Sequence, residues 1–312
     1  MKTERSGKPL AGVIPILPTP FTPEGAVDDE SFRDVVDAAI AGGAHGLAMF
    51  GLASEYYKLS DAERARLVKI LVQQTARRCP VVISITPHST LLAKREAAQA
   101  VESGADALML LPPFFLGPSP RAVARHIQEV AAVAKLPMIL QYAPLQTGQV
   151  IEPDAFAELS GSIPNLTRVK VDMVPAGPTI SDLCSRGIAC FVGYMGLDLP
   201  EDFSRGATGV MPTVSVTAAL AEIWRLLDDD QEKARSLHHE LLPLLNFMMQ
   251  SVEFLIACEK EILVHLGVLR SSYRREPTIH LDHAQKTELD MLLDRLAGGL
   301  SLMKNTLHRR GS

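Results

Sequence analysis

Short apolar segments alternate with longer segments of helical period from about residue 12 to residue 215, and this alternation restricts the fold more than any other feature of the sequence. Each apolar segment is rich in Val, Ile, Leu and Met and has the length of one β-strand. Near-continuous apolar character indicates strands that are buried on both faces, as in a parallel sheet. The predicted strands are Gly12–Leu17, Gly46–Gly51, Val81–Thr86, Ala107–Leu111, Met138–Tyr142, Leu166–Asp172, Ala189–Gly193 and Gly209–Thr213.

The segments between these strands carry the signals of helices. Ser60 and Glu63 have the spacing of a capping box, and Pro153 suits the first turn of a helix. A sheet whose strands alternate with helices is parallel and covered on both faces, and eight repeats favour closure into a TIM (β/α)8 barrel. The predicted helices of this part are Asp29–Ala41, Asp61–Arg78, Leu91–Glu102, Arg121–Ala134, Pro153–Leu159, Thr179–Ser185 and Leu199–Arg205.

After about residue 218 the pattern becomes purely helical. Pro243 and the polar segment 270–277 interrupt this region, but no linker of low complexity separates it from the preceding part. We therefore predict an α/β fold with two parts, a barrel of residues 1–218 and a C-terminal helical region of residues 219–312. The predicted helices of the second part are Ala219–Leu227, Gln231–Leu245, Val252–Leu266 and Asp282–Leu296.

The composition disfavours several classes of function. The 31 basic and 36 acidic residues are interspersed and give a net charge of −5, so the chain offers no large basic surface to nucleic acid. The charge-free stretches are too short or too interrupted to cross a bilayer, and residues 1–6 are not followed by the apolar core of a signal peptide. The four cysteines form no CxxC motif and no cluster with histidine, which predicts a reducing cytoplasm and no metal site.

One predicted strand, Leu166–Asp172, carries a lysine and an aspartate near its end. Alternation along the strand directs Arg168, Lys170 and Asp172 to one face. Lysine is rarely buried unless it is paired or functional, and a desolvated amine loses its proton more readily and becomes a nucleophile near neutral pH. From these residues alone, a surface strand with a solvated Lys170 stays open as the alternative.

The carboxyl ends of the strands are where a barrel of this kind places its active site. The turn Gly51–Glu55 follows the second strand with small residues and main-chain N–H groups that can hold a carboxylate or a phosphate. Gln141 is expected to point into the barrel near Lys170, on the next strand. Gly193 ends the seventh strand, where a missing side chain would let a ligand approach the backbone. For the Gly51–Glu55 turn, an ordinary strand-to-helix connection is the alternative.

Taken together, five features of the sequence resemble the dihydrodipicolinate synthase / N-acetylneuraminate lyase family over nearly the whole chain. These features are the segments Gly12–Asp28, Gly51–Glu55, Leu136–Gly148 and Gly267–Arg275 and the sixth-strand Lys170. The resemblance implies an (α/β)8 barrel that is usually tetrameric. It also implies that Lys170 forms a Schiff base with the ketone of pyruvate or another 2-oxo acid.

The turn after the second strand departs from the family pattern. The family usually has Gly-x-Thr-Gly-Glu or Gly-Thr-Thr-Gly-Glu at this place, whereas Leu52, Ala53 and Ser54 occupy the middle of the turn here. Two hydroxyl groups are therefore missing, and Ser54 stands where glycine is usual.

Three further departures concern groups that move protons or bind the second substrate. The tyrosine that commonly relays protons from the fifth strand is replaced by Gln141, which can form hydrogen bonds but cannot titrate. The tyrosine pair after the fourth strand corresponds to Phe114 and Phe115. The arginine that binds the carboxylate of the synthase's aldehyde substrate corresponds to Gln146. Dihydrodipicolinate synthesis is therefore not expected, and Asp172 is the nearest group that could titrate.

These observations predict a lyase in which Lys170 attacks the C2 ketone of a 2-oxo acid while the Gly51–Ser54 turn holds the C1 carboxylate. The run Val169–Asp172, with Pro175 and Gly177-Pro178 after it, also resembles the branch that contains 2-keto-3-deoxy sugar-acid dehydratases, such as that acting on 2-keto-3-deoxyarabonate. The candidate catalytic residues are Lys170, Asp172 and Gln141. The candidate substrate-binding residues are Gly51, Ala53, Ser54, Glu55, Tyr142, Gly193 and Met211.

The favoured reaction is thus the dehydration of a 2-keto-3-deoxy sugar acid. A pyruvate-releasing aldolase is the close alternative, and a non-catalytic 2-oxo-acid binding protein is the distant one. For Asp172 itself, a structural role as the cap of the following loop is the alternative. We expect no cofactor besides the covalent Schiff base on Lys170, a small-molecule 2-oxo acid as partner, no nucleic acid, no membrane, a homotetramer or homodimer, and a cytoplasmic location.

Overall fold

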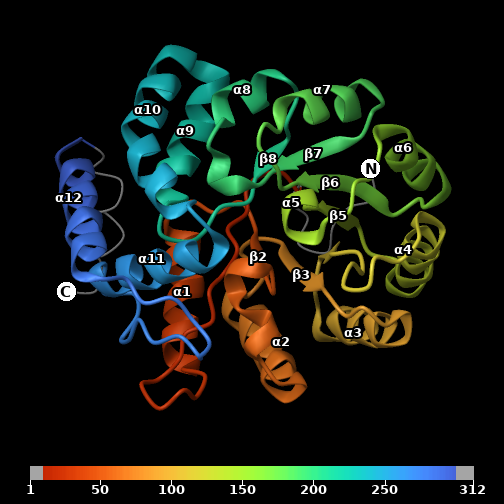
Figure 1. The fold of residues 1–312 in the computed structure, drawn as a ribbon, viewed down its shortest axis with the longest axis horizontal. Helices are drawn as coiled ribbons and strands as arrows, with labels where there is room; N and C mark the ends of the chain where they lie inside the picture. Colours follow the sequence, from red (N-terminus) through yellow and green to blue (C-terminus); the bar gives the residue numbers. More distant parts are fainter. Residues whose placement is uncertain (1–9, 300–312) are drawn as a thin grey trace.

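The computed structural model describes residues 10–299, in which eight parallel strands form one sheet in the order β1-β8-β7-β6-β5-β4-β3-β2 (Figure 1). Ile16 bridges both Ala48 and Thr213, so the chain that continues β1 joins the two ends of the sheet. The predicted TIM barrel is confirmed. The strands are β1 (Gly12–Val13), β2 (Leu47–Met49), β3 (Val81–Ile85), β4 (Ala107–Leu110), β5 (Met138–Tyr142), β6 (Leu166–Val171), β7 (Ala189–Val192) and β8 (Gly209–Val210).

The first and last strands are shorter than predicted because each runs into a proline. Pro15 and Pro212 have no N–H group to donate to a neighbouring strand. Their carbonyl groups still accept hydrogen bonds, from Ala48 N–H at 2.9 Å and from Ile16 N–H at 2.7 Å. The barrel therefore closes through carbonyl acceptors at this edge.

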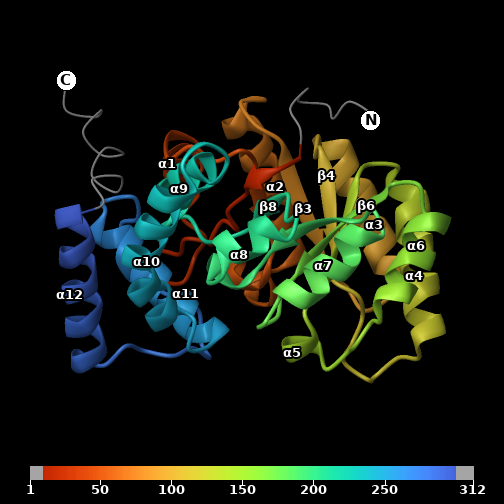
Figure 2. The ribbon, with the colours of Figure 1, turned by 90° about the horizontal axis from the view of Figure 1, so that it is seen from above.

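Helices surround the barrel on its outside (Figure 2). The predicted end of α2 at Arg78 is wrong, because Ala76 and Arg77 take φ values of 47° and 60° and stop the helix. The short helix α5 (Pro144–Thr147) was not predicted. The other helices around the barrel are α1 (Asp29–Ala41), α2 (Asp61–Thr75), α3 (Thr90–Ser103), α4 (Pro120–Ala134), α6 (Pro153–Ser162), α7 (Gly177–Ser185), α8 (Leu199–Ser204) and α9 (Thr217–Asp229), with 3₁₀ turns η1 (Leu52–Ser54), η2 (Tyr56–Lys58) and η3 (Tyr194–Gly196).

The side chains of the strands form two separate cores. Alternate residues such as Met109, Ile139 and Phe191 fill the inside of the barrel. The residues between them, such as Leu140 and Tyr142, pack against the surrounding helices. This alternation decides which strand residues can reach a pocket inside the barrel, because neighbours along one strand face opposite cores.

Beyond the barrel lie three helices, α10 (Gln231–Met248), α11 (Val252–His265) and α12 (His283–Gly299). By contrast, α9 packs on β1 and α1 and completes the ring of helices around the barrel. The side chains of α9, α10 and α11 belong to the same core as the outer faces of the strands. We therefore propose that the additional region begins at Gln231, not at residue 219, and that it shares the core of the barrel.

Within residues 10–299, no single helix is both long enough and apolar enough to cross a membrane. Only α10 and α11 taken together have that length and composition, and the chain bends by 117° between them.

Candidate active site

A pocket opens inside the barrel at the carboxyl ends of the strands. Five of the candidate residues line it, namely Lys170, Asp172, Gln141, Ala53 and Met211. Gln141 follows the inward-facing Ile139 by two residues on β5, so the alternation of the strand directs it into the barrel. These five residues come from β5, β6, the turn after β2 and the end of β8.

The most polar part of the pocket is a cluster of three buried side chains. Asp172 Oδ2 lies 2.9 Å from Lys170 Nζ and accepts a hydrogen bond of 2.8 Å from Gln141 Nε2. Lys170 and Asp172 are each 6% exposed and Gln141 is 2% exposed. Gln141 and Lys170 also lie opposite each other in the register of β5 and β6. The alternative of a surface strand with a solvated Lys170 is therefore wrong.

Two glycines make room for neighbouring side chains. A Cβ atom at Gly193 would lie 1.8 Å from Asp172 Oδ1, so a side chain here would displace the carboxylate. We expected Gly193 to let a ligand approach the backbone, and this expectation is corrected because Asp172 occupies the space. At Gly51, a Cβ would lie 2.9 Å from Cγ2 of Ile16, which lines the pocket.

The placement expected for Ser54 is also corrected. Its hydroxyl donates to the Leu17 carbonyl at 2.6 Å and accepts from the Phe50 N–H at 3.0 Å. The side chain is fully buried, and it holds the main chain beneath the turn. Only Leu52 and Ala53 of this turn reach the pocket.

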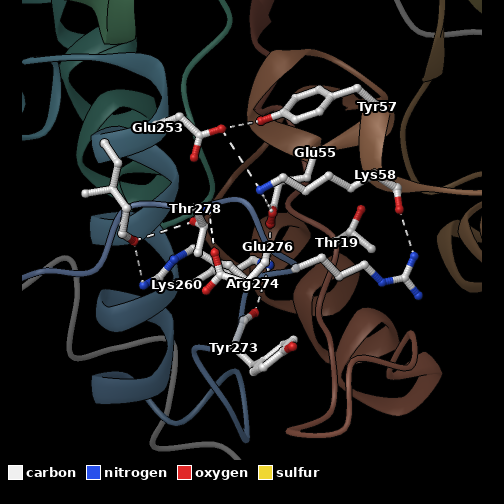
Figure 3. A network of polar contacts seen from close by, with 12 residues as sticks. Thr19, Glu55, Tyr57, Lys58, Glu253, Lys260, Tyr273, Arg274, Glu276 and Thr278 are labelled. Atoms are coloured by element: carbon white, nitrogen blue, oxygen red, sulfur yellow. Dashed lines mark hydrogen bonds and ion pairs between the residues drawn. The ribbon is translucent and has the colours of Figure 1, made fainter.

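Glu55 likewise lies outside the pocket, contrary to expectation. It adopts the left-handed conformation with φ of 54° and is completely buried. Its Oε1 lies 2.5 Å from Lys260 Nζ and its Oε2 lies 3.1 Å from Lys58 Nζ (Figure 3). Two cations therefore neutralise this carboxylate, and they hold it away from the pocket.

Lys260 joins α11 to the barrel from within the protein. Besides Glu55, its ammonium donates to the Tyr273 carbonyl at 3.2 Å and lies 4.4 Å from the centre of the Phe21 ring. Burial lowers the pKa of Lys260 to about 8, and the negative charge of Glu55 opposes this shift. The cost of burying the ammonium thus exceeds the stabilisation that Glu55 provides, and removal of Glu55 would leave the ammonium buried without a countercharge at 2.5 Å.

Tyr142 lies on the outer side of the barrel. Its ring packs edge-on against Phe156 of α6, with 5.2 Å between the ring centres. As the neighbour of Gln141 on one strand, it must face the opposite core. The expectation that Tyr142 contacts the substrate is therefore corrected.

Several residues that line the pocket are not among the candidate site residues, although Gln146 had been noted as standing where the synthases have an arginine. Gln146 of α5 and Tyr194 of η3 line the pocket and form a hydrogen bond of 2.8 Å from Gln146 Nε2 to the Tyr194 hydroxyl. Tyr194 directly follows Gly193, so a search of the residues after each strand could have found it. No signal in the sequence could have placed the pocket residues that come from the start of α11 and the turn before it. These are Met249, Val252 and Leu255.

Glu259, one turn further along α11, holds the loop that follows β8. Its Oε2 accepts from the hydroxyls of Thr213, at 2.6 Å, and of Ser215, and its Oε1 accepts from the N–H groups of Val214 and Ser215 at 2.9 and 3.0 Å. Burial raises the pKa of Glu259, while the four donors oppose that shift. Since Thr213 lines the pocket, α11 supports one pocket wall through Glu259.

Residues 9–296 match the model of the dihydrodipicolinate synthetase family. The chain belongs to this family. The 4-hydroxy-tetrahydrodipicolinate synthase of Acidobacterium capsulatum is 30% identical over 305 residues, which cover 95% of this chain and 98% of that protein. The enzyme of the same name from Haloarcula marismortui is 31% identical over 280 residues, with coverages of 87% and 90%.

Solved structures of the family have the same fold. The dihydrodipicolinate synthase of Rhodopseudomonas palustris matches with a TM-score of 0.86 at 25% identity, over 92% of this chain and 97% of that one. A prophage protein of Escherichia coli K12 from the same family, solved in complex with pyruvate, matches with a TM-score of 0.86 at 24% identity, over 92% and 99%.

Membership of the dihydrodipicolinate synthetase family makes this protein an enzyme, a lyase of the class I Schiff-base type. The family acts through a Schiff base between a lysine and pyruvate and uses no external cofactor. Within residues 10–299, no group of three or more His, Cys, Asp or Glu side chains could hold a metal ion.

Proposed function

We propose that this enzyme dehydrates a 2-keto-3-deoxy sugar acid through a Schiff base on Lys170. In this proposal Asp172 transfers protons and Gln141 orients Asp172. In the same proposal the C1 carboxylate is held by the N–H groups of Leu52 and Ala53, which line the pocket and begin a 3₁₀ turn, where the first N–H groups have no partner within the turn.

The proposal rests on the carboxylate of Asp172, whose Oδ2 lies 2.9 Å from Lys170 Nζ. Once the substrate's C2 is bonded to this nitrogen, C3 is only one bond further from it, so a base beside the amine is placed to take a C3 proton. The tyrosine that relays protons elsewhere in the family is replaced by Gln141, which cannot titrate. Gln141 instead donates to Asp172 and fixes its orientation.

The reaction follows from these positions. Lys170 passes a proton to Asp172 and attacks C2 as the neutral amine. The C2 oxygen leaves as water with a second proton from the nitrogen and the proton that Asp172 returns, and the resulting iminium makes the C3 protons acidic. Asp172 takes one C3 proton and the electron pair forms an enamine. The enamine then breaks the C4–O bond, and the hydroxide leaves as water with a proton from Asp172. Hydrolysis of the remaining iminium releases the product and restores Lys170.

A pyruvate-releasing aldolase is the close alternative, because the same enamine is also the product of C3–C4 cleavage. Both reactions exchange a proton with the C4 hydroxyl, but only dehydration begins with removal of a C3 proton, and the Asp172 carboxylate beside Lys170 Nζ favours that step. The curated relatives carry the name of the synthase, but Gln141 and Gln146 give this pocket neither a titrating relay group nor a cation for a second carboxylate. A protein that only binds 2-oxo acids would form no product at all.

Replacing Asp172 by asparagine tests the assignment of the base. We expect the rate of dehydration of 2-keto-3-deoxyarabonate to fall about a hundredfold or more, because the amide cannot accept the C3 proton. Exchange of the pyruvate methyl protons with deuterated solvent, followed by NMR, should slow in parallel. Asp290→Asn, on the exposed side of α12, makes the same replacement away from the pocket and should change neither rate.

Unchanged dehydration and unchanged exchange in Asp172→Asn would retire Asp172 as the base and leave it as a loop cap. If wild-type enzyme instead converts the substrate to free pyruvate and an aldehyde, the aldolase alternative is correct.

A homotetramer or homodimer belongs to the same proposal, since members of the family are usually oligomeric. Phe115 and Leu116, between β4 and α4, are 78% and 87% exposed, and such apolar side chains are candidates for a subunit contact. Light scattering should therefore give the mass of a dimer or tetramer, and replacing both residues by serine should lower it. A wild-type monomer at micromolar concentration would contradict this part.

A cytoplasmic location is the last part of the proposal. None of the four cysteines, all within residues 10–299, forms a disulfide, which is usual in a reducing compartment. Fractionation of cells should find the protein with cytoplasmic markers, and recovery from another compartment would contradict this part.

A further inference from the structure

The hydrogen bond between Gln146 and Tyr194 leaves two polar groups unused in the wall of the pocket. Gln146 Nε2 donates to the Tyr194 oxygen, so the phenolic hydrogen of Tyr194 remains free to donate. Within residues 10–299, this hydrogen has no acceptor, and the buried Oε1 of Gln146 has no donor. The opposite orientation of the amide gives the same balance, one free donor and one free acceptor.

The other polar side chains of the pocket already have hydrogen-bond or ion-pair partners. Lys170, Asp172 and Gln141 are engaged with one another, and the hydroxyl of Thr213 donates to Glu259. The remaining lining side chains are apolar. Gln146 and Tyr194 are therefore the polar side chains of the described pocket that are free to recognise a part of the substrate away from Lys170.

The backbone that carries Tyr194 is held in an uncommon conformation. Tyr194 and Met195 have φ values of 45° and 59°, in the left-handed region that residues other than glycine rarely adopt. Such conformations cluster at functional sites. Here the conformation places the tyrosine directly after Gly193, with its hydroxyl against Gln146 of another loop.

We infer that Gln146 and Tyr194 recognise a hydroxyl group of the substrate beyond C4, and so select hydroxylated 2-oxo acids; this inference rests on the proposed function. A hydroxyl both donates and accepts, so it satisfies the free acceptor and the free donor together. A carboxylate would meet the Gln146 oxygen without a cation, and a methyl group would leave both polar groups unpaired. Sites built to bond a hydroxyl reject analogues that lack it far more strongly than apolar pockets reject an added one.

Two acids that differ only at C5 test this inference on the wild-type enzyme. 2-Keto-3-deoxyarabonate has a C5 hydroxyl, and 4-hydroxy-2-oxopentanoate has a methyl group instead. We expect the first acid to compete with pyruvate for borohydride trapping at Lys170 at a concentration about tenfold or more below that needed for the second acid. Two neutral hydrogen bonds provide discrimination of this order. Tyr194→Phe and Gln146→Leu should each reduce the ratio between the two competing concentrations. Tyr273→Phe, whose hydroxyl lies outside the pocket, is the matched control and should keep the ratio.

Equal competition by the two acids with wild-type enzyme overturns the inference, even if both variants fail to fold, and it leaves the Schiff-base mechanism intact. A ratio that both folded variants retain overturns it as well. Absence of any pyruvate adduct on Lys170 would instead refute the proposed function, on which the inference rests.

Discussion

Replacing Lys170 by methionine is expected to lower the turnover of any 2-oxo acid by at least about a thousandfold, the order seen when a catalytic nucleophile is removed. Methionine retains an apolar side chain of similar length but has no amine to attack the ketone. Lys170 is buried at the end of β6, and no other lysine lines the described pocket. No other amine there can therefore take its place. The measurement is steady-state turnover of 2-keto-3-deoxyarabonate.

Because Lys170→Met leaves the buried Asp172 without its cation, the fold must be checked separately. Circular dichroism of this variant and of Lys170→Met/Asp172→Asn, which removes both charges, shows whether the barrel is intact. Lys286→Met, on the exposed side of α12, is the matched control and should keep full turnover. A folded Lys170→Met enzyme with turnover within tenfold of wild type would exclude Lys170 as the nucleophile.

Replacing Lys260 by methionine is expected to lower the free energy of unfolding by about 3 kcal/mol, the lower end of the range for breaking a buried ion pair. Glu55 has no exposed surface and would lose its partner at 2.5 Å, although Lys58 at 3.1 Å would remain. Unfolding in urea, followed by circular dichroism, measures the change.

The double variant Lys260→Met/Glu55→Gln removes both charges of this pair, and within residues 10–299 Lys58 then keeps only Glu253 as an ion-pair partner, at 4.0 Å. Compared with the two single variants, it gives the coupling energy between Lys260 and Glu55, which we expect to be favourable. A loss below about 0.5 kcal/mol in the single variant would show that the pair does not hold α11 against the barrel. Lys286→Met again provides the comparison at an exposed site, where a change within about 0.5 kcal/mol is usual.

Much of the fold follows from the alternation of apolar segments and helical segments along the sequence. Eight apolar segments of strand length, separated by helical segments, predicted the barrel correctly because such strands bury both faces. The boundaries that failed have local causes. Pro15 and Pro212 shorten β1 and β8, and Ala76, in the left-handed conformation, ends α2 before Arg78. No pattern of hydrophobicity distinguishes α9, which completes the barrel, from the helices that follow it.

The sequence was less informative about the site. Alternation along β5 and β6 correctly directed Gln141 and Lys170 inward, since it depends only on each strand. Glu55 was misplaced because its partner, Lys260, is some two hundred residues away and no local pattern shows which charge will meet it. The wall formed by α11 was missed for the same reason.

Reductive trapping with pyruvate tests directly whether Lys170 forms the Schiff base. The enzyme is incubated with pyruvate and borohydride, digested, and analysed by mass spectrometry. We expect one added pyruvate-derived group, located on Lys170 and absent from Lys170→Met, while Lys260 stays unmodified because it is paired with Glu55 and has no exposed surface. No adduct, or an adduct located on another lysine, would contradict it.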